Sequence, residues 1–193
     1  IGNNPLPGMD QVFTHISGGE NMFMPDPKID AVKPGPVGLN SIAGLLKHLP
    51  ALTCLGSPTV NSYRRLWDTG FWAPVYADWG YQNRTCSVRV SAPGRVEYRS
   101  VDSSHNPYLM GAGILKAFED GLDNKMDPGE PEKKNIYDAM KEGKEVDKLP
   151  LTLGEAIQRL DSDDVIKSAL PEDMLRVFMH YKNDEWEKFL SAV

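Results

Sequence analysis

The sequence predicts an α+β fold, in which a strand-rich segment lies between two helical segments and a helical tail follows. Residues 74–101 are rich in Val, Tyr, Trp and Thr, and the turn formers GYQN and SAPG interrupt them, which is typical of short strands. Residues 38–49 and 106–125 repeat apolar side chains at helical spacing on either side of this segment. Residues 151–193 show similar spacing, so we expect helices both before and after the strands.

Composition limits the class of protein. The chain has 193 residues, enough for one medium domain or one domain with a helical appendage, and 40% are hydrophobic. A net charge of −6 argues against nucleic acid as a partner. No apolar run approaches the ~18 residues of a membrane span, so we expect no membrane partner either. Cys54 and Cys86 lack CxxC spacing, which predicts buried thiols in a cytoplasmic protein.

The first 50 residues divide into a loop-rich part and a helix. Residues 1–37 contain many turn formers, with VFTHI and NMFM as possible short strands. The helix predicted over 38–49 ends at Pro50, because proline disrupts helix interiors. His48 then lies at the end of the helix, where the dipole favours a cation. Its apolar positions are Leu39, Ile42, Leu45, Leu46 and Leu49.

The strand-rich segment contains the stretch RVEYRS, residues 95–100. Alternation along a strand places Arg95, Glu97 and Arg99 on one face, with Val96 and Tyr98 on the other. The APG sequence before it predicts a hairpin with the preceding strand. Such a face is either a surface ion-pair ladder or a site that binds anions and a metal.

The second half of the chain is predicted to be mainly helical. In the helix over 106–125, Asn106 is a cap, Pro107 fits the first turn, and small residues at 111–113 allow close packing against a sheet. Residues 126–150 are polar and predict a surface loop. In the tail, Thr152 and Glu155 form a capping box before a helix. Ser162 starts a second helix, and a third opens with Pro171, Glu172 and Asp173. We expect one face of this third helix to pack against the core, through Met174, Val177, Phe178, Tyr181 and Phe189.

Arginines are concentrated in the middle of the chain. No lysine lies between Lys47 and Lys116, although lysine is common on ordinary surfaces. Arginine without lysine, beside aromatic residues, is typical of bidentate recognition of carboxylate or phosphate. Structural arginines that pair with acids elsewhere would give the same composition, which alone does not decide. Six of the eight arginines fall in this region: Arg64, Arg65, Arg84, Arg89, Arg95 and Arg99.

Glu97 has two possible roles. A carboxylate among anion-binding arginines stays ionised and is a suitable ligand for Mg²⁺, which takes one or two carboxylates together with substrate phosphates. Alternatively, it is only an electrostatic partner for Arg95 and Arg99. His15 lies near a Gly-Gly turn, and a single histidine does not by itself indicate a catalytic site. The sequence contains no Walker A loop, GxGxxG, GxSxG or zinc-ligand spacing.

Several of these stretches, taken in order, resemble motifs of the glutamine synthetase family. The match runs from about residue 38 to residue 138, its catalytic motifs fall within 38–125, and it corresponds to the later part of the family's catalytic domain. The stretches that carry the resemblance are HLPALTCLGSPTVNSY (48–63), NSYRRL (61–66), GFWAPVY (70–76), NRTCSVRV (83–90) and RVEYRSVDSSHNPYL (95–109).

The resemblance implies a curved antiparallel sheet forming part of a barrel, with outer helices. It also implies homo-oligomers built as stacked hexameric rings, the dodecamer of the family. The family's N-terminal domain and its early metal-binding carboxylates would precede Ile1. We therefore expect the 193-residue chain alone to be incomplete as a ligase.

The resemblance implies ATP-dependent formation of the γ-amide of glutamate through γ-glutamyl phosphate. ATP and Mg²⁺ or Mn²⁺ are the implied cofactors, and glutamate with ammonia or a small amine are the implied substrates. By position, the metal ligand is Glu97. The glutamate-binding residues are Arg65, Arg84 and Arg99; the catalytic arginines against the phosphates are Arg84 and Arg89; and the nucleotide side has His15 and Ser17.

Three positions depart from the family pattern. Phe13 stands where a histidine metal ligand is expected, and Ala92 where a lysine is common. Trp72 replaces the glutamate that caps the active site and helps to deprotonate ammonium. Because indole accommodates an alkyl group or an alkylammonium ion, Trp72 predicts an amine pocket, as in γ-glutamylamide or γ-glutamylpolyamine synthetases. The alternatives are a divergent glutamine synthetase, a non-catalytic structural relative, and a small-anion binding module.

Overall fold

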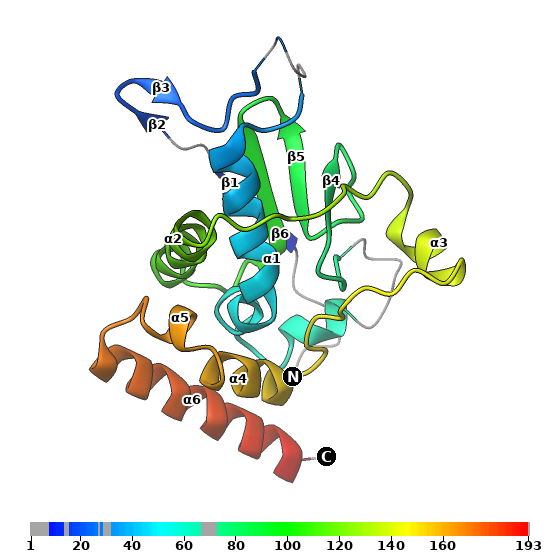
Figure 1. Ribbon diagram of the computed structural model, residues 1–193. Helices are drawn as coiled ribbons and strands as arrows, with labels where there is room; N and C mark the ends of the chain where they lie inside the picture. The colour runs from blue at the N-terminus through cyan, green and yellow to red at the C-terminus, as the bar shows by residue number, and fades with distance from the viewer. Residues whose placement is uncertain (1–7, 14–15, 27, 29–31, 67–72, 193) are drawn as a thin grey trace.

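The computed structural model describes residues 8–13, 16–26, 28, 32–66 and 73–192, and these form a small mixed sheet with helices packed against it (Figure 1). The predicted α+β class is confirmed. The strands are β1 Gly8–Phe13, β2 Ile16–Ser17, β3 Glu20–Asn21, β4 Trp79–Tyr81, β5 Val88–Ala92 and β6 Arg95–Asp102. The helices are α1 Pro36–Gly56, the short 3₁₀ helix η1 Ser62–Arg65, α2 Pro107–Asp123, α3 Ile136–Lys141, α4 Leu153–Asp161, α5 Asp164–Lys167 and α6 Glu172–Ser191.

The main sheet has the strand order β1-β6-β5-β4. Strands β1 and β5 both pair antiparallel with β6, whereas β4 pairs parallel with β5, so the sheet is mixed at one edge rather than antiparallel throughout. The predicted hairpin over the APG sequence is confirmed as the β5–β6 connection. Gly94 has a φ of +71°, a conformation that glycine adopts without steric cost. Strands β2 and β3 form a separate two-stranded sheet.

Helix α1 runs on to Gly56, so the prediction that it ends at Pro50 was wrong. Pro50 lies inside the helix. A proline removes one backbone hydrogen bond, but the last turn gains burial, because Leu52, Cys54 and Leu55 are in the core. Helix α1 packs against β6, α2 and α4 together and is therefore the central element of the core.

Helix α2 begins as predicted. The Asn106 side chain accepts hydrogen bonds from the backbone N–H groups of Tyr108 and Leu109, and Pro107 occupies the first turn. Its small residues, however, do not pack against the sheet as predicted. A Cβ at Gly113 would contact Leu52 and Leu55 of α1, whereas one at Gly111 would meet nothing within 4 Å. The close approach is therefore between two helices.

The segment 126–150 is more ordered than the predicted surface loop. It contains α3, and Lys148 forms an isolated bridge with Tyr76 next to the sheet. Glu132 in this segment is buried at 9% exposure. The segment thus forms part of the wall beside β4 (Figure 1).

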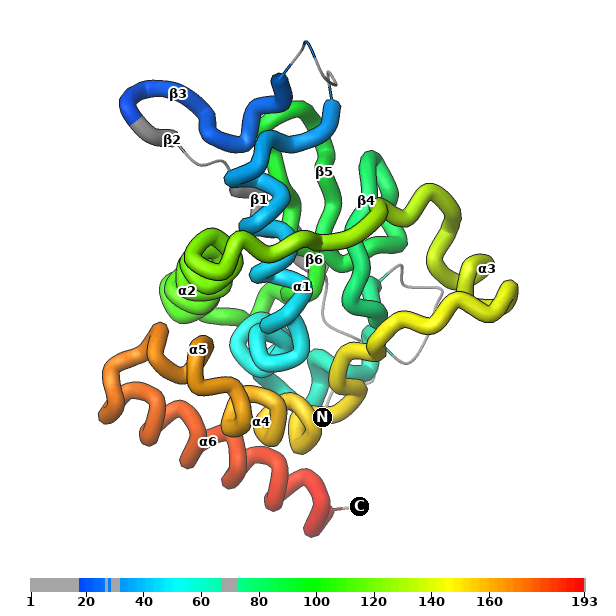
Figure 2. The backbone as a smooth tube through the Cα atoms, viewed as in Figure 1, coloured from blue at the N-terminus to red at the C-terminus, as the bar shows by residue number. Residues whose placement is uncertain are grey.

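The tail is helical, and α6 lies along the outside of α4 (Figure 2). The predicted capping box is present, with one difference: Thr152 accepts from the Glu155 N–H, but the Glu155 carboxylate accepts from the N–H of Leu151 rather than from that of Thr152. The second helix starts one residue later than predicted, with Asp163 rather than Ser162 as its cap.

The predicted core face of α6 was largely wrong. Met174, Val177 and Tyr181 are exposed, and none of the helix's residues is fully buried. Phe178 and Phe189 are half-buried, and Phe189 stacks on Trp186 with ring centroids 5.5 Å apart. The side chains of α6 that pack against the core form a different stripe, of which the sequence predicted only Phe178: Leu175, Phe178, Met179 and Trp186.

Cys54 and Cys86 are free thiols and are buried, as predicted. In the part of the chain that the structure describes, none of the helices has both the length and the apolar character needed to cross a lipid bilayer.

The α1–α2 contact predicts the effect of a single methyl group. A Cβ at Gly44 would lie 2.0 Å from the Ala117 carbonyl oxygen, so Gly44→Ala must move one helix and should lower the free energy of unfolding by about 2–3 kcal/mol. Gly111→Ala is the matched control, because it adds the same methyl to open space and should gain about 0.5–1 kcal/mol of helix propensity. Urea unfolding measures both. Equal stabilities of the two variants would contradict the close packing.

Candidate functional site

A buried ion-pair cluster lies on the β5–β6 hairpin. The pairing register places Arg89 of β5 directly opposite Glu97 of β6, so both side chains lie on the same face of the sheet. Arg89 Nη1 donates to both Glu97 carboxylate oxygens at 3.1 Å. Arg99, two residues along β6, brings its Nε to 3.2 Å from Glu97 Oε1. One carboxylate is thus held between two guanidinium groups, which we call the Glu97 cluster.

The Glu97 cluster is shielded from water. Glu97 is only 6% exposed, and the side chains of Arg89 and Arg99 are largely covered. On the opposite face, Val96 and Tyr98 are completely buried in the core, as the alternation predicted. Because charges in such a site are weakly screened, their attraction is stronger than in a surface ladder of ion pairs.

Arg95 does not belong to the Glu97 cluster. Its side chain is exposed at the hairpin, and its Nε donates to Ser91 Oγ at 2.9 Å. The interpretation that Glu97 is paired with Arg95 was therefore wrong. Arg89 takes that role, because it lies directly opposite Glu97 on the neighbouring strand and its guanidinium group reaches the carboxylate.

Arg99 is fixed on its other side by the turn before β5. Its Nη1 donates to the backbone carbonyl oxygens of Arg84 and Cys86, the latter at 3.4 Å. The Arg84 side chain itself is exposed. In this structure, then, Arg84 contributes a carbonyl oxygen to the cluster, and its guanidinium group faces solvent.

The other predicted residues are placed less completely. Arg65 is in η1 and is buried at 5% exposure. His15 and Trp72 lie outside the described residues, and Ser17 is described only as a backbone position in β2. Of the departures, Phe13 pairs with Val96 in the sheet, and Ala92 ends β5 beside the hairpin turn.

Gln82 also belongs to the site, although the sequence did not predict it. Gln82 has a φ of +50° and accepts a hydrogen bond from Arg89 Nη2 at 2.6 Å, while its own amide donates to the Ser91 carbonyl at 2.5 Å. It therefore orients the guanidinium group of Arg89. A glutamine carries no local signal for this role, because the contact depends on the parallel pairing of β4 with β5.

The Glu97 cluster can supply one ligand to a cation, but it is not a complete metal site. Across the described ranges, no three His, Cys, Asp or Glu side chains gather as metal ligands. Glu97 nevertheless offers a carboxylate held in a fixed orientation. Because Mg²⁺ uses one or two carboxylates together with phosphate oxygens, a single carboxylate fits the share expected of this chain.

The motifs and the geometry agree with the comparison to protein families. The model for the catalytic domain of glutamine synthetase matches residues 11–193. The chain belongs to the glutamine synthetase family. The resemblance seen in the motifs is therefore confirmed, and it extends well beyond residues 38–138. Proteins of this family generally use ATP and a divalent metal.

Individual relatives agree with the family assignment. Glutamine synthetase of Pyrococcus woesei is 42% identical over 193 residues, which cover 96% of this chain and 42% of the relative. Glutamine synthetase of Archaeoglobus fulgidus is 45% identical over 157 residues, covering 77% and 32%. The chain therefore spans less than half the length of these curated relatives.

Solved structures give the same fold. A complex of GmaS, a γ-glutamylmethylamide synthetase, with ADP matches with a TM-score of 0.88 at 33% identity, covering 96% of this chain and 43% of that one. GmaS without ligand matches with a TM-score of 0.86. The fold of the glutamine synthetase catalytic domain is thereby confirmed for this chain.

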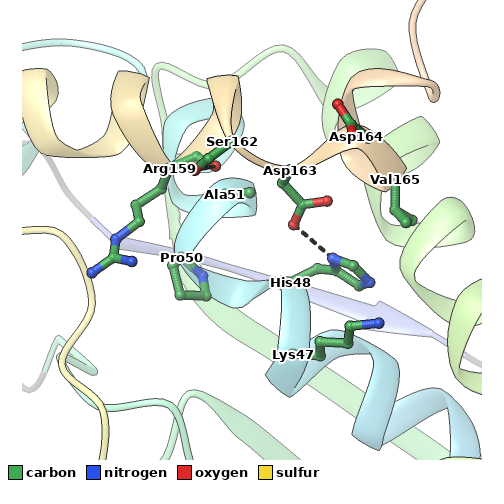
Figure 3. A pocket seen from close by; sticks show the side chains of 9 residues that line it. All are labelled: Lys47, His48, Pro50, Ala51, Arg159, Ser162, Asp163, Asp164 and Val165. Atoms are coloured by element: carbon green, nitrogen blue, oxygen red, sulfur yellow. Dashed lines mark hydrogen bonds and ion pairs between the residues drawn. The ribbon is translucent and has the colours of Figure 1, made fainter.

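A second polar cluster joins α1, α2 and the α4–α5 connection, and Figure 3 shows its Lys47, His48 and Asp163. His48 is buried in the middle of α1, so its predicted place at a helix end was wrong. Its Nδ1 lies 2.6 Å from an Asp163 oxygen and its Nε2 lies 2.8 Å from an Asp120 oxygen. Lys47 also reaches Asp120, at 2.8 Å. Lys47, His48 and Asp163 line a pocket of about 340 Å³ between α1 and the α4–α5 connection.

The two carboxylates control the ionisation of His48. Burial alone would lower the pKa of His48, but the hydrogen bonds and charges of Asp163 and Asp120 outweigh it and raise this pKa above its ordinary 6.5. Burial acts on the carboxylates in the opposite sense, yet their hydrogen bonds with His48, and with Lys47 for Asp120, hold both pKa values below the ordinary 3.8. The cluster therefore stabilises the fold in its ionised form.

This predicts a pH-dependent stability. Because the pKa of His48 is raised in the folded state, its contribution is complete below about pH 6.5 and is lost as the pH rises through the folded pKa. Urea unfolding between pH 6.5 and 9 should show this loss in the wild type, and His48→Gln should abolish it. His180→Gln, which changes an exposed histidine on α6, should keep the wild-type slope. Parallel curves for the wild type and His48→Gln would contradict the role of the cluster.

Proposed function

We propose that the protein to which this chain belongs is an ATP-dependent ligase that forms the γ-amide of glutamate through γ-glutamyl phosphate. The observation that carries the proposal is the Glu97 cluster, which places a buried carboxylate between Arg89 and Arg99 in a member of the glutamine synthetase family. A covered site with fixed positive charge suits a reaction in which an anionic phosphoryl group passes between anions.

Each member of the site has a proposed task. Arg84 and Arg89 face the transferring phosphoryl group, and the hydrogen bond from Arg89 to Gln82 keeps one of these guanidinium groups oriented before substrates bind. Arg65, Arg84 and Arg99 bind the carboxylates of glutamate. The partly covered Arg99 suits this task, because its remaining donors are directed by the carbonyl oxygens that hold it.

The cofactors are proposed to be ATP and Mg²⁺ or Mn²⁺. Glu97 would hold one divalent cation, which when bound neutralises charge on the phosphate oxygens. His15 and Ser17 are proposed to lie on the nucleotide side. Further metal ligands are proposed to come from outside the described residues, and the active protein is proposed to be a cytoplasmic homo-oligomer of hexameric rings.

The incoming nitrogen is proposed to come from a small amine rather than from ammonia. Trp72 stands where the family has the glutamate that helps to deprotonate ammonium, and indole cannot accept that proton. An indole face does bind alkyl groups and alkylammonium ions. The similarity to GmaS supports the same choice, although the identity to glutamine synthetases, at 42%, is higher than the 33% to GmaS.

A non-catalytic relative explains the structure less well. Such a protein would need the fold but not a desolvated cluster of charges, because replacing buried ion pairs by apolar residues is often neutral or stabilising. Retention of Arg65, Arg89, Glu97 and Arg99 in covered positions therefore favours a site. A small-anion binding module would not require the ordered series of family motifs.

An amine panel tests the proposed function. The complete protein is incubated with ATP, Mg²⁺ and glutamate, together with ammonia, methylamine, ethanolamine or a polyamine, and the release of phosphate and the γ-glutamyl product are measured. We expect both to depend on glutamate, with an amine used at least about tenfold better than ammonia in kcat/KM. A clear preference for ammonia would overturn the amine version only. Phosphate release that is independent of glutamate would overturn the ligase itself.

A further inference from the structure

We propose that Asp78 is a positioning residue for Arg99, and that it acts through the turn of residues 83–87. This inference rests on the proposed function, in which Arg99 binds a carboxylate of glutamate. Asp78 itself does not contact the Glu97 cluster. It lies directly before β4, on the far side of the turn, and is 6% exposed.

Asp78 fastens the end of the turn with both its side chain and its backbone. Its Oδ1 accepts a hydrogen bond from the Ser87 N–H at 3.1 Å. Its backbone carbonyl accepts from the Val88 N–H, also at 3.1 Å. These two bonds fix the position at which the turn enters β5, because neighbouring amides of the chain are held by the same residue.

The turn of residues 83–87, held by Asp78, also holds Arg99. The Arg99 side chain donates to the carbonyl oxygens of Arg84 and Cys86, which belong to the turn. The backbone N–H of Arg99 donates to the Ser87 carbonyl at 2.9 Å. Ser87 therefore bonds Asp78 through its N–H and Arg99 through its carbonyl, so a shift of Ser87 moves the guanidinium group relative to Glu97.

The turn does not require a charged acceptor at position 78. One acceptor for the Ser87 N–H could come from a neutral Asn, without the cost of burying a charge. The charged form makes a hydrogen bond roughly twice as strong as a neutral acceptor does. The stronger hydrogen bond would fix the carbonyl oxygens that hold Arg99, although burying the charge lowers the free energy of unfolding.

The surroundings of Asp78 make its charge sensitive to pH. Burial raises the pKa of Asp78 to about 6, against the opposing hydrogen bonds of Ser87 and Cys86. The charged groups that act on it come from the segment around α3: Lys144 favours its ionised form and Glu132 disfavours it. These two are paired with each other, so they largely cancel. The hold on the turn should therefore weaken as the pH falls below about 6.

Steady-state kinetics of the complete protein test the proposal. Asp78→Ala removes the acceptor and should raise the KM for glutamate about tenfold or more, with the KM for ATP changed less than about twofold. Asp78→Asn keeps an acceptor and should restore most of the lost affinity, but its KM for glutamate should no longer rise as the pH falls from 7 to 5.5. Asp102→Ala is the matched control: Asp102 is another buried aspartate, it accepts from the Ser104 N–H at 2.8 Å, and its loss should leave both KM values unchanged.

A second measurement separates this inference from the proposed function. Amide hydrogen exchange should accelerate at Ser87 and Arg99 in Asp78→Ala but not in Asp102→Ala, whether or not the protein is a ligase. Unchanged exchange at both amides would overturn the inference. An unchanged KM for glutamate in an active Asp78→Ala enzyme would also overturn it. Accelerated exchange in a protein without ligase activity would leave the link to Arg99 standing and overturn the proposed function.

Discussion

A carboxylate buried between two guanidinium groups is the interaction on which the rest of this structure depends. Glu97 is held by Arg89 across the strands and by Arg99 along its own strand. Removing one partner from such a group leaves an uncompensated charge, at a cost of about 3–5 kcal/mol. The register of the β5–β6 hairpin is therefore constrained from both faces. A slip of one residue would move Glu97 into the apolar core and Val96 into the charged cluster.

The surrounding elements hold the two arginines from different sides. Gln82, at the end of the β4 strand, directs Arg89, and the carbonyl oxygens of the turn before β5 direct Arg99. On the other face of the sheet, Tyr98 and Val96 lie in the core that α1 shares with α2 and α4. The positive charges are thus fixed before any substrate arrives, which is the condition under which electrostatic groups stabilise a transition state without reorganising.

The sequence predicted what depends on local patterns. Alternation gave the faces of residues 95–100, APG gave the hairpin, and the Asn106 and Thr152 caps marked helix starts. Partners from other strands were not predictable, because alternation specifies a face and not the residue opposite. Arg95 was chosen for this reason, although Arg89 is the partner. The predictions that α1 ends at Pro50 and that α6 turns its apolar residues to the core were wrong for a similar reason, because burial in the tertiary structure decides both. Gln82 and Asp78 gave no signal, because their roles arise only from the contact of β4 with β5.

The most direct test is the dependence of turnover on Mg²⁺ in Glu97→Gln, which keeps the size of the side chain and removes its charge. Glu132→Gln is the control, because it neutralises another buried, ion-paired carboxylate, one that pairs with Lys144 outside the Glu97 cluster. With both variants folded, as judged by circular dichroism and thermal unfolding, we predict that Glu97→Gln lowers Mg²⁺-dependent turnover about 100-fold or more and that Glu132→Gln stays near the wild type. Turnover of Glu97→Gln near the wild-type value, with the same Mg²⁺ half-saturation, would contradict the account and leave Glu97 as a structural ion pair.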